Sequence, residues 1–369
     1  MISFELTEEQ RMILDTVEAF ARDEIRPAAR AADEDGQVPV ELVQKIWDLG
    51  LVCGGLPEEF GGDGGQRSAV TGAVAGEALA YGDLSIAIHA LAPRLVAYPI
   101  LEMGTDEQRA RYLPGFAAAG FCAGAAALME PRWDFDVLSL ATSAVKSGTG
   151  YVLNGSKCYV PLGAESEFVI VYALSAPARG VSDVDAFILP RGCSGMTLGE
   201  REKNMGLKGL PTYGLSLKDC AVGSDARLGG ERGINFPRLM SEAKVALASM
   251  AVGVARAAFD YARDYALQRR AFGAPIATKQ AIAFMLAEMA LEVDASRLLA
   301  WEAASRLDKG EDAFKESCQA KSYAAAAVLK IADNAVQILG GHGYIREHPV
   351  EMWLRNARGF AALEGITTV

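Results

Sequence analysis

The chain turns at Gly340-Gly341-His342-Gly343-Tyr344, directly after a long apolar helical pattern, and later reads Leu363-Glu364-Gly365. Between the two, a shorter helical segment carries Arg355 and Arg358. Backbone amides at such a turn and the fixed charge of arginine suit the binding of phosphates. A carboxylate among apolar neighbours becomes more basic because it is poorly solvated, which suits Glu364 to taking a proton from carbon. This stretch therefore predicts phosphate binding and a carboxylate base.

The length and composition predict a folded protein of two or three domains. Its 369 residues can bury a large core, and 51% of them are hydrophobic. A net charge of -11 argues against nucleic acid or a membrane surface as an electrostatic partner, although local clusters can still hold small anions. The most apolar segment, 86–101, is interrupted by Arg94 and two prolines. We expect it to be too short to span a membrane.

The cysteines and histidines do not indicate disulfides or metal sites. Six cysteines are scattered with no C-x-x-C pair, so we expect reduced, mostly buried thiols in a cytoplasmic protein. The three histidines are not paired at helical spacing, and we expect no zinc site. The first residues contain neither a basic region nor an apolar run, so no signal peptide is expected.

The pattern along the chain changes twice. It predicts a helical domain at 1–120, a β-domain at 121–230 and a helix bundle at 231–369. Helices followed by strands and then by helices form an α+β order that is mostly α.

Local signals place several elements within these parts. Thr7-Glu8-Glu9-Gln10 is a capping box, which predicts the start of a helix. In the middle part, strand-like residues on both sides of Asn154-Gly155 predict a β-hairpin over 151–160. Short apolar runs predict further strands at 168–172 and 186–189.

Three very long helical patterns follow, at roughly 235–268, 275–308 and 313–338. Alanine-rich helices of this length pack as a bundle and commonly also pack against other subunits.

Two motifs lie at the ends of these helices. Arg269-Arg270-Ala271-Phe272-Gly273 precedes Gln280, and Gln337-Ile338-Leu339-Gly340-Gly341 closes the third helix. A guanidinium offers a planar donor fork to a pyrophosphate, but a solvated arginine pair also commonly ends a helix. Likewise, paired glycines can serve only as a C-terminal cap. No Walker A sequence occurs and no G-x-G-x-x-G follows a strand, so the ordinary nucleotide-binding folds lack support.

In order and spacing, these motifs and the later Glu364-Gly365 resemble the acyl-CoA dehydrogenases, flavoenzymes that desaturate acyl thioesters. The resemblance covers essentially the whole chain. It implies FAD as the cofactor, with Arg269 at the pyrophosphate and with the second motif meeting the FAD of a neighbouring subunit. The cofactor positions that it assigns to the bundle are Arg269, Phe272, Gln280, Gln337, Gly340 and Gly341.

The middle domain departs from the family pattern, which usually reads Thr-Glu-Pro-x-x-Gly-Ser-Asp and later Trp-Ile-Thr. This chain reads Met129-Glu130-Pro131-Arg132-Trp133-Asp134-Phe135-Asp136 and later Tyr159-Val160-Pro161. Met129 replaces the hydroxyl that helps to hold the flavin ring, and Phe135 replaces the usual serine. Tyr159 can stack on the ring or be an ordinary core aromatic, and Pro161 offers neither a hydroxyl nor an amide donor.

In the family, the glutamate of a Glu-Gly-Thr motif is the base, and Glu364 has the same spacing from Gly340. A glutamate so near the end of a sequence is otherwise ordinarily solvated. A rival base position known in relatives is Ala243 here, and the adjacent Glu242 should point about 100° away on a helix. The substrate-binding positions that the resemblance assigns are Phe135, Lys244 and Gly365.

We therefore expect an N-terminal helical domain, a central β-barrel-like domain and a C-terminal four-helix bundle, assembled as a homotetramer or heterotetramer. The expected reaction is FAD-dependent α,β-desaturation of an acyl-CoA or acyl-carrier-protein thioester. Glu364 would be the base, flavin N5 the hydride acceptor and an electron-transfer flavoprotein the partner. Two alternatives stay open: a poorly active or non-catalytic subunit of a heteromeric dehydrogenase, and a flavin oxidase or monooxygenase of the same superfamily.

Overall fold

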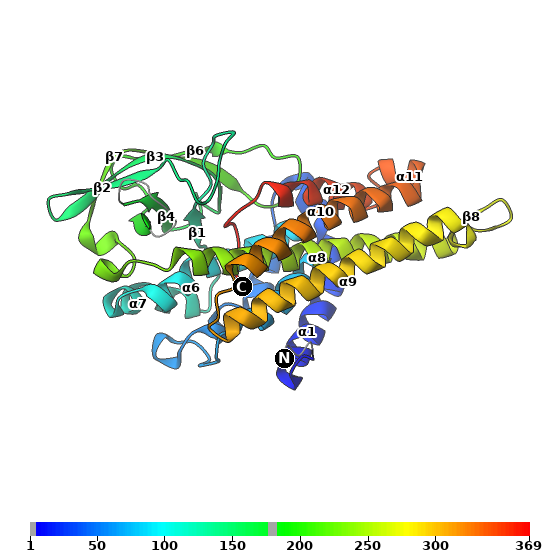
Figure 1. The fold of residues 1–369 in the computed structure, drawn as a ribbon, viewed down its shortest axis with the longest axis horizontal. Coiled ribbons are helices and arrows are strands. Elements are labelled where there is room, and N and C mark those ends of the chain that lie inside the picture. The colour runs from blue at the N-terminus through cyan, green and yellow to red at the C-terminus, as the bar shows by residue number, and fades with distance from the viewer. Residues whose placement is uncertain (1–4, 176–182) are drawn as a thin grey trace.

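The computed structural model describes residues 5–175 and 183–369. They form an N-terminal helical part, a middle curled sheet and a C-terminal part with long helices, as Figure 1 shows. The predicted fold class is confirmed. The sheet lies at one end of the long helices, and their other end projects as an arm that carries β8 (Figure 1).

The N-terminal part begins at the predicted capping box. Its helices are α1 (Glu8–Phe20), α2 (Arg26–Asp35), α3 (Val40–Trp47), α4 (Ala69–Gly82), α5 (Leu84–Leu91), α6 (Arg94–Met103) and α7 (Asp106–Tyr112). Thr7 Oγ1 accepts a hydrogen bond from the Gln10 N–H (3.2 Å), and Gln10 Oε1 accepts one from the Thr7 N–H (3.0 Å). These bonds satisfy amides that have no partner within the helix.

Two apolar stretches reach the length of a membrane crossing. Leu84–Met103, which contains α5 and α6, is long and apolar enough, so the expectation that this segment is too short is wrong. Helix α8 (Phe236–Gln268) meets the same criterion. The protein itself buries 89% of the first stretch and 78% of the second, as it does for core helices.

The middle part forms one sheet. Its strands are β1 (Ala125–Ala127), β2 (Ser143–Ser147), β3 (Gly150–Pro161), β4 (Phe168–Leu174), β5 (Val184–Pro190), β6 (Met196–Arg201) and β7 (Thr212–Gly223). They lie in the order β1-β4-β2-β3-β7-β6, and β5 pairs with β4. The strands predicted at 168–172 and 186–189 are confirmed as parts of β4 and β5.

The hairpin predicted over 151–160 is wrong, because both of its arms belong to the single strand β3. The ladder between β3 and β7 shifts register between Leu153 and Gly155, as at a β-bulge. A Cβ on Gly155 would lie 2.6 Å from Thr142 Oγ1. This glycine therefore permits a close approach of the neighbouring chain and does not form a turn.

The three long predicted helices are present in the C-terminal part. Its elements are α8, β8 (Arg270–Ala271), β9 (Ala274–Pro275), α9 (Gln280–Asp308), α10 (Phe314–Leu339), α11 (Gly341–Tyr344) and α12 (Val350–Ala357). Helix α9 begins later than predicted, because β9 and a 3-10 turn at Ile276–Thr278 precede it.

Helix α4 packs against α8 and α9, so the N-terminal and C-terminal parts share one core. Glu77 on α4 is 4% exposed and accepts hydrogen bonds from Arg256 on α8 (3.1 Å) and Arg297 on α9 (2.9 Å). Asp308 at the end of α9 accepts from the Ser68 hydroxyl (2.7 Å) and from the Ala69 N–H at the start of α4. These carboxylates join three helices from distant parts of the sequence.

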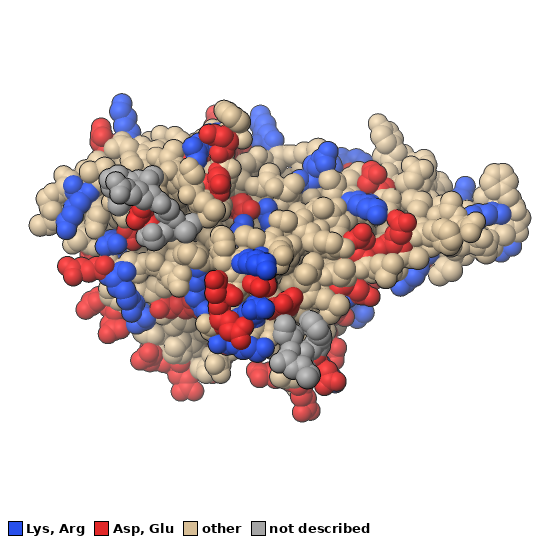
Figure 2. Space-filling view, viewed as in Figure 1, with Lys and Arg blue, Asp and Glu red and all other residues tan. Residues whose placement is uncertain are grey.

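The expectation of mostly buried thiols is wrong, because only Cys220 is fully buried and the other five cysteines are partly exposed. Across residues 5–175 and 183–369, no three His, Cys, Asp or Glu side chains gather in a way that could hold a metal ion. Figure 2 shows charged side chains of both signs mixed over one face, with acidic ones gathered along its lower edge.

Candidate active site

A cavity of about 850 Å³, here called the main cavity, lies between the middle part and the long helices. Met129, Cys158 and Tyr159 line it from the β-domain, together with the loop 130–138. Lys244 of α8 and Glu364 line it from the helical side. The fold thus brings residues that are more than two hundred positions apart in the sequence together in the main cavity.

Glu364 lies in a short coil after α12, and its side chain is 16% exposed. Its Oε2 accepts a hydrogen bond from Lys244 Nζ (2.8 Å), and its Oε1 accepts one from Lys321 Nζ of α10 (2.9 Å). The expected apolar surroundings of this carboxylate are therefore wrong. Two ammonium groups fix its orientation, and charge-assisted hydrogen bonds of this kind are short and strong.

The position after Glu364 requires glycine for two reasons. Its φ is +62°, and a Cβ would lie 2.4 Å from Leu128 Cδ2. Only glycine meets both conditions without strain. Gly365 itself is buried and does not line the main cavity, although the sequence predicted it as a substrate-binding residue.

Glu130 anchors the loop along the rim of the main cavity. It accepts hydrogen bonds from Lys157 Nζ (3.1 Å) and from the N–H groups of Ala141 (2.7 Å) and Thr142 (2.8 Å). Burial alone would raise the pKa of Glu130, but the charge of Lys157 and these amides lower it. Burial lowers the pKa of Lys157 to about 8, although Glu130 opposes this. The pair holds the loop against the start of β2.

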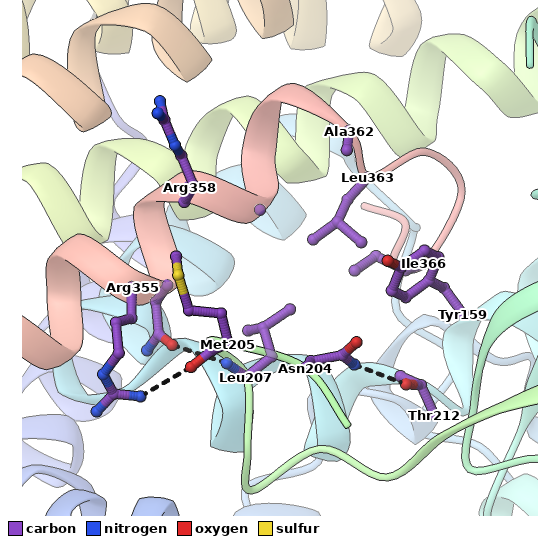
Figure 3. A pocket seen from close by; sticks show the side chains of 13 residues that line it. Tyr159, Asn204, Met205, Leu207, Thr212, Arg355, Arg358, Ala362, Leu363 and Ile366 are labelled. Carbon is purple, nitrogen blue, oxygen red and sulfur yellow. Dashed lines mark hydrogen bonds between the residues drawn. The ribbon is translucent and has the colours of Figure 1, made fainter. Parts of the chain in front are cut away.

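Tyr159 lies between the main cavity and a second cavity of about 210 Å³. Figure 3 shows this second cavity, which Tyr159 and Ile366 both line and where Asn204 Nδ2 donates to Thr212 Oγ1 (2.9 Å). Tyr159 has a φ of +52°, and its N–H points at the Glu202 carboxylate (3.1 Å). Its side chain lines both cavities, where an aromatic ring can pack on a planar ligand, whereas its N–H is already used.

The other site residues predicted in the middle domain, Met129 and Pro161 for the flavin and Phe135 for the substrate, differ in their positions. Met129 is buried in the cavity wall, and its Sδ lies 3.4 Å from the backbone nitrogen of Glu364. Phe135 lines the same cavity from the loop. Pro161 is buried in β3 opposite Thr212 and lines neither of these two cavities.

The residues predicted for the cofactor phosphates lie at the other end of the bundle. Arg269, Gly340 and Gly341 line a cavity of about 330 Å³ between the ends of α8 and α10. Phe272 stands at the tip of the β8–β9 hairpin and is 95% exposed. The exposed predicted side chains that do not line this cavity are Phe272, Gln280 and Gln337.

This arrangement fits a dinucleotide. Within the described part of the chain, Arg269 has no ion-pair partner, and a Cβ on Gly340 or Gly341 would meet no atom within 4 Å. An unpaired guanidinium beside open glycines suits a pyrophosphate. Lys244 and Arg269 are 25 positions apart along α8, which is about 37 Å at 1.5 Å per residue. One chain therefore presents two separate halves of the predicted cofactor site.

Lys321 and Glu202 also belong to the site, although no motif in the sequence predicts them. Lys321 lies on a buried helix face and bonds Glu364, and Glu202 holds the Tyr159 amide. The only sequence signal for Lys321 is that a lysine occurs among small residues on α10, because its partner Glu364 is 43 positions away. The rival Glu242 does not face the main cavity, because it pairs with Arg67 (2.6 Å) and Arg238 (3.1 Å).

Sequence models of three domains match the chain in order. They describe the acyl-CoA dehydrogenase N-terminal domain at residues 7–120, the middle domain at 125–220 and the C-terminal domain at 236–369. Together they cover most of the sequence.

Whole-length relatives agree with these matches. An acyl-CoA dehydrogenase of Bacillus subtilis is 37% identical, over 99% of this chain and 96% of its own length. The human mitochondrial short-chain specific acyl-CoA dehydrogenase is 36% identical, over 100% of this chain and 89% of its own. Among solved structures, butyryl-CoA dehydrogenase from Megasphaera elsdenii superposes with a TM-score of 0.88 at 31% identity, over 97% of this chain and 95% of that one.

Proposed function

This chain belongs to the acyl-CoA dehydrogenase family, and on that premise we propose that it desaturates an acyl thioester between its α and β carbons, with Glu364 as the base. The family identifies it as an oxidoreductase that depends on FAD and oxidises acyl-CoA.

The observation that supports this proposal most is the position of Glu364. Its carboxylate lies on the wall of the largest of the cavities described above, between the β-domain and α8, and two lysines fix its direction. A general base must be within reach of the proton that it takes. Glu364 lines the main cavity, so a thioester held there can approach its carboxylate.

In the proposed reaction, the thioester enters the main cavity with its α-carbon against Glu364. The α C–H bond breaks, and the proton passes to the carboxylate. When bound, FAD supplies at its N5 atom the acceptor for the hydride of the β-carbon. Tyr159 and Met129 would pack against the ring, while Arg269 with Gly340 and Gly341 would hold the pyrophosphate.

The distance between the two halves of the cofactor site supports assembly with a second copy, whose bundle end would complete the site. Helix α9 also presents large exposed apolar side chains at intervals of seven residues: Phe284 (60% exposed), Leu291 (71%) and Leu298 (44%). Such a stripe suits helix packing between copies. We propose a homotetramer in the cytoplasm, with electrons leaving to an electron-transfer flavoprotein.

The test is Glu364→Gln, assayed by anaerobic bleaching of the bound flavin with a panel of acyl-CoA thioesters. We expect an unchanged flavin content and a rate lowered by about 10²- to 10⁴-fold, the usual contribution of a general base. Asp136→Asn is the matched control, because Asp136 lines the same cavity but already accepts from the Leu138 N–H (2.9 Å). Bleaching at the original rate in Glu364→Gln would remove this residue from the mechanism.

A further inference from the structure

Cys193 and Cys220 bring two thiols into contact in the β-domain. Their Sγ atoms lie 3.4 Å apart and are not linked. Cys220 is fully buried on β7, and Cys193 is partly exposed in the turn between β5 and β6. Within residues 5–175 and 183–369, which include all six cysteines, no other two cysteine sulfurs are in hydrogen-bonding contact. Neither residue lines the main cavity, so the pair is separate from the site of the proposed reaction.

The backbone fixes the approach of the two thiols. In the antiparallel pairing of β6 with β7, the Lys218 N–H donates to the Gly195 carbonyl (2.8 Å), and the same count places Cys193 opposite Cys220. Gly195 has a φ of +84°, and a Cβ on it would lie 2.7 Å from Cys220 Cα, so the turn lies directly against β7. A disulfide needs its sulfurs at about 2.05 Å, which requires each of them to move by only about 0.7 Å.

We propose that Cys193 and Cys220 form a reversible disulfide when hydrogen peroxide oxidises Cys193. Cys193 reacts first because it is partly exposed. Burial, and secondarily the hydrogen bond with Cys193, raises the pKa of Cys220 to about 12 and keeps Cys220 a thiol until that point.

Two steps complete the oxidation. The Cys193 sulfur attacks one peroxide oxygen, the O–O bond breaks, and a sulfenic acid and one water form. The Cys220 sulfur then attacks the sulfenic sulfur, the S–O bond breaks, and the thiol proton leaves with the hydroxide as a second water. The two thiols thus lose two electrons in total, and the peroxide is reduced to two waters.

The disulfide would close a segment that reaches the second cavity. Strand β6 lies at the edge of the sheet beside β7, and the segment 193–220 contains it together with Glu202. Glu202 accepts from the Tyr159 N–H (3.1 Å), and Asn204 and Thr212 line the second cavity. A cross-link between positions 27 apart restricts the unfolded chain, so the oxidised protein should unfold at a temperature higher by about 3–6 °C.

The test treats the FAD-loaded protein with hydrogen peroxide and then labels its free thiols with N-ethylmaleimide in denaturant. Mass spectrometry should find two labels fewer than the six of the untreated chain, with the peptides of Cys193 and Cys220 joined. Dithiothreitol should restore all six. Thermal unfolding of the same samples should show the rise in temperature, and the reductant should reverse it.

Three variants assign the link to these two thiols. Cys193→Ser changes a partly exposed turn and should keep all its remaining thiols free, with no rise in unfolding temperature. Cys220→Ala should stop at the sulfenic acid of Cys193, which dimedone traps. Cys122→Ser is the matched control, because Cys122 is also partly exposed and its loss should leave the link intact.

The proposal is overturned if the treated wild type keeps six labels, or if Cys193 is oxidised without becoming joined to Cys220. An unfolding temperature that stays the same after the link has formed would overturn the constraint on β6.

Discussion

Replacing Gly365 by alanine tests how closely the backbone positions the proposed base. The φ of +62° costs a residue with a Cβ about 1–2 kcal/mol. The new methyl group would also lie 2.4 Å from Leu128 Cδ2, and overpacking of a core costs about 1–3 kcal/mol. Together we expect the free energy of unfolding to fall by about 2–5 kcal/mol.

The same change should slow the reaction, because Glu364 is the adjacent residue. A displacement of about 1 Å at a reacting group lowers the rate by about a hundredfold. The assays are urea unfolding for stability and anaerobic flavin bleaching for the rate. Gly310→Ala is the matched control: its φ is +70° and no atom lies within 4 Å of a Cβ there, so it should lose only about 1–2 kcal/mol and no activity.

A double-mutant cycle separates the backbone strain at position 365 from the steric clash with Leu128. Leu128→Ala removes the side chain that the new methyl group would meet, so it should restore about 1–3 kcal/mol to Gly365→Ala, relative to the sum of the single changes. If Gly365→Ala were as stable and as fast as the wild type, the reasoning from this contact would be refuted. If the two single changes simply added, the contact with Leu128 would not be the cause.

Two other predictions concern pH and assembly. Burial, and secondarily the charge of Arg201, lowers the pKa of His89 from 6.5 to about 4. As the pH falls, the unfolded chain therefore binds a proton at His89 before the folded chain does. The contribution of the neutral His89 to the free energy of unfolding is complete above pH 6.5 and is lost as the pH falls toward 4. Relative to His89→Phe, the wild type should lose up to about 3 kcal/mol over that range by urea unfolding, and parallel curves would contradict this. Leu291→Glu should reduce the assembled mass in sedimentation, whereas Met12→Glu, at a similarly exposed position, should not. An unchanged mass for Leu291→Glu would exclude this face of α9 from the interface.

Much of the fold could be predicted because its signals are local. The capping box at Thr7 and Gln10 and the apolar periodicity of the long helices lie within a few residues of the structures that they specify. The pair Asn154-Gly155 misled because a hairpin turn and a β-bulge favour the same residues. Pairing of β3 with β7, more than fifty positions away, decides between them.

The candidate site was predictable only in part, for the same reason. The spacing of motifs located Glu364, but its environment depends on Lys244 and Lys321, which come from two different helices. A lysine on a mostly buried helix face gives no sequence signal of its partner. The separation of Arg269 from the main cavity follows from the straight course of α8, which the length of the helix implied.

The shared core of the two helical parts has a consequence for how such a protein can change over time. The β-domain enters and leaves the chain between α7 and α8, so it is an insertion into a helical body held together through α4. The positions that depart from the family pattern, Met129, Phe135, Tyr159 and Pro161, all lie in this insertion. Those that keep it, Arg269, Gly340 and Glu364, all lie in the helical body. None of these four positions lies on α4, α8 or α9, so changes at them leave the side chains that join these three helices in place, even though Met129 belongs to the same apolar core.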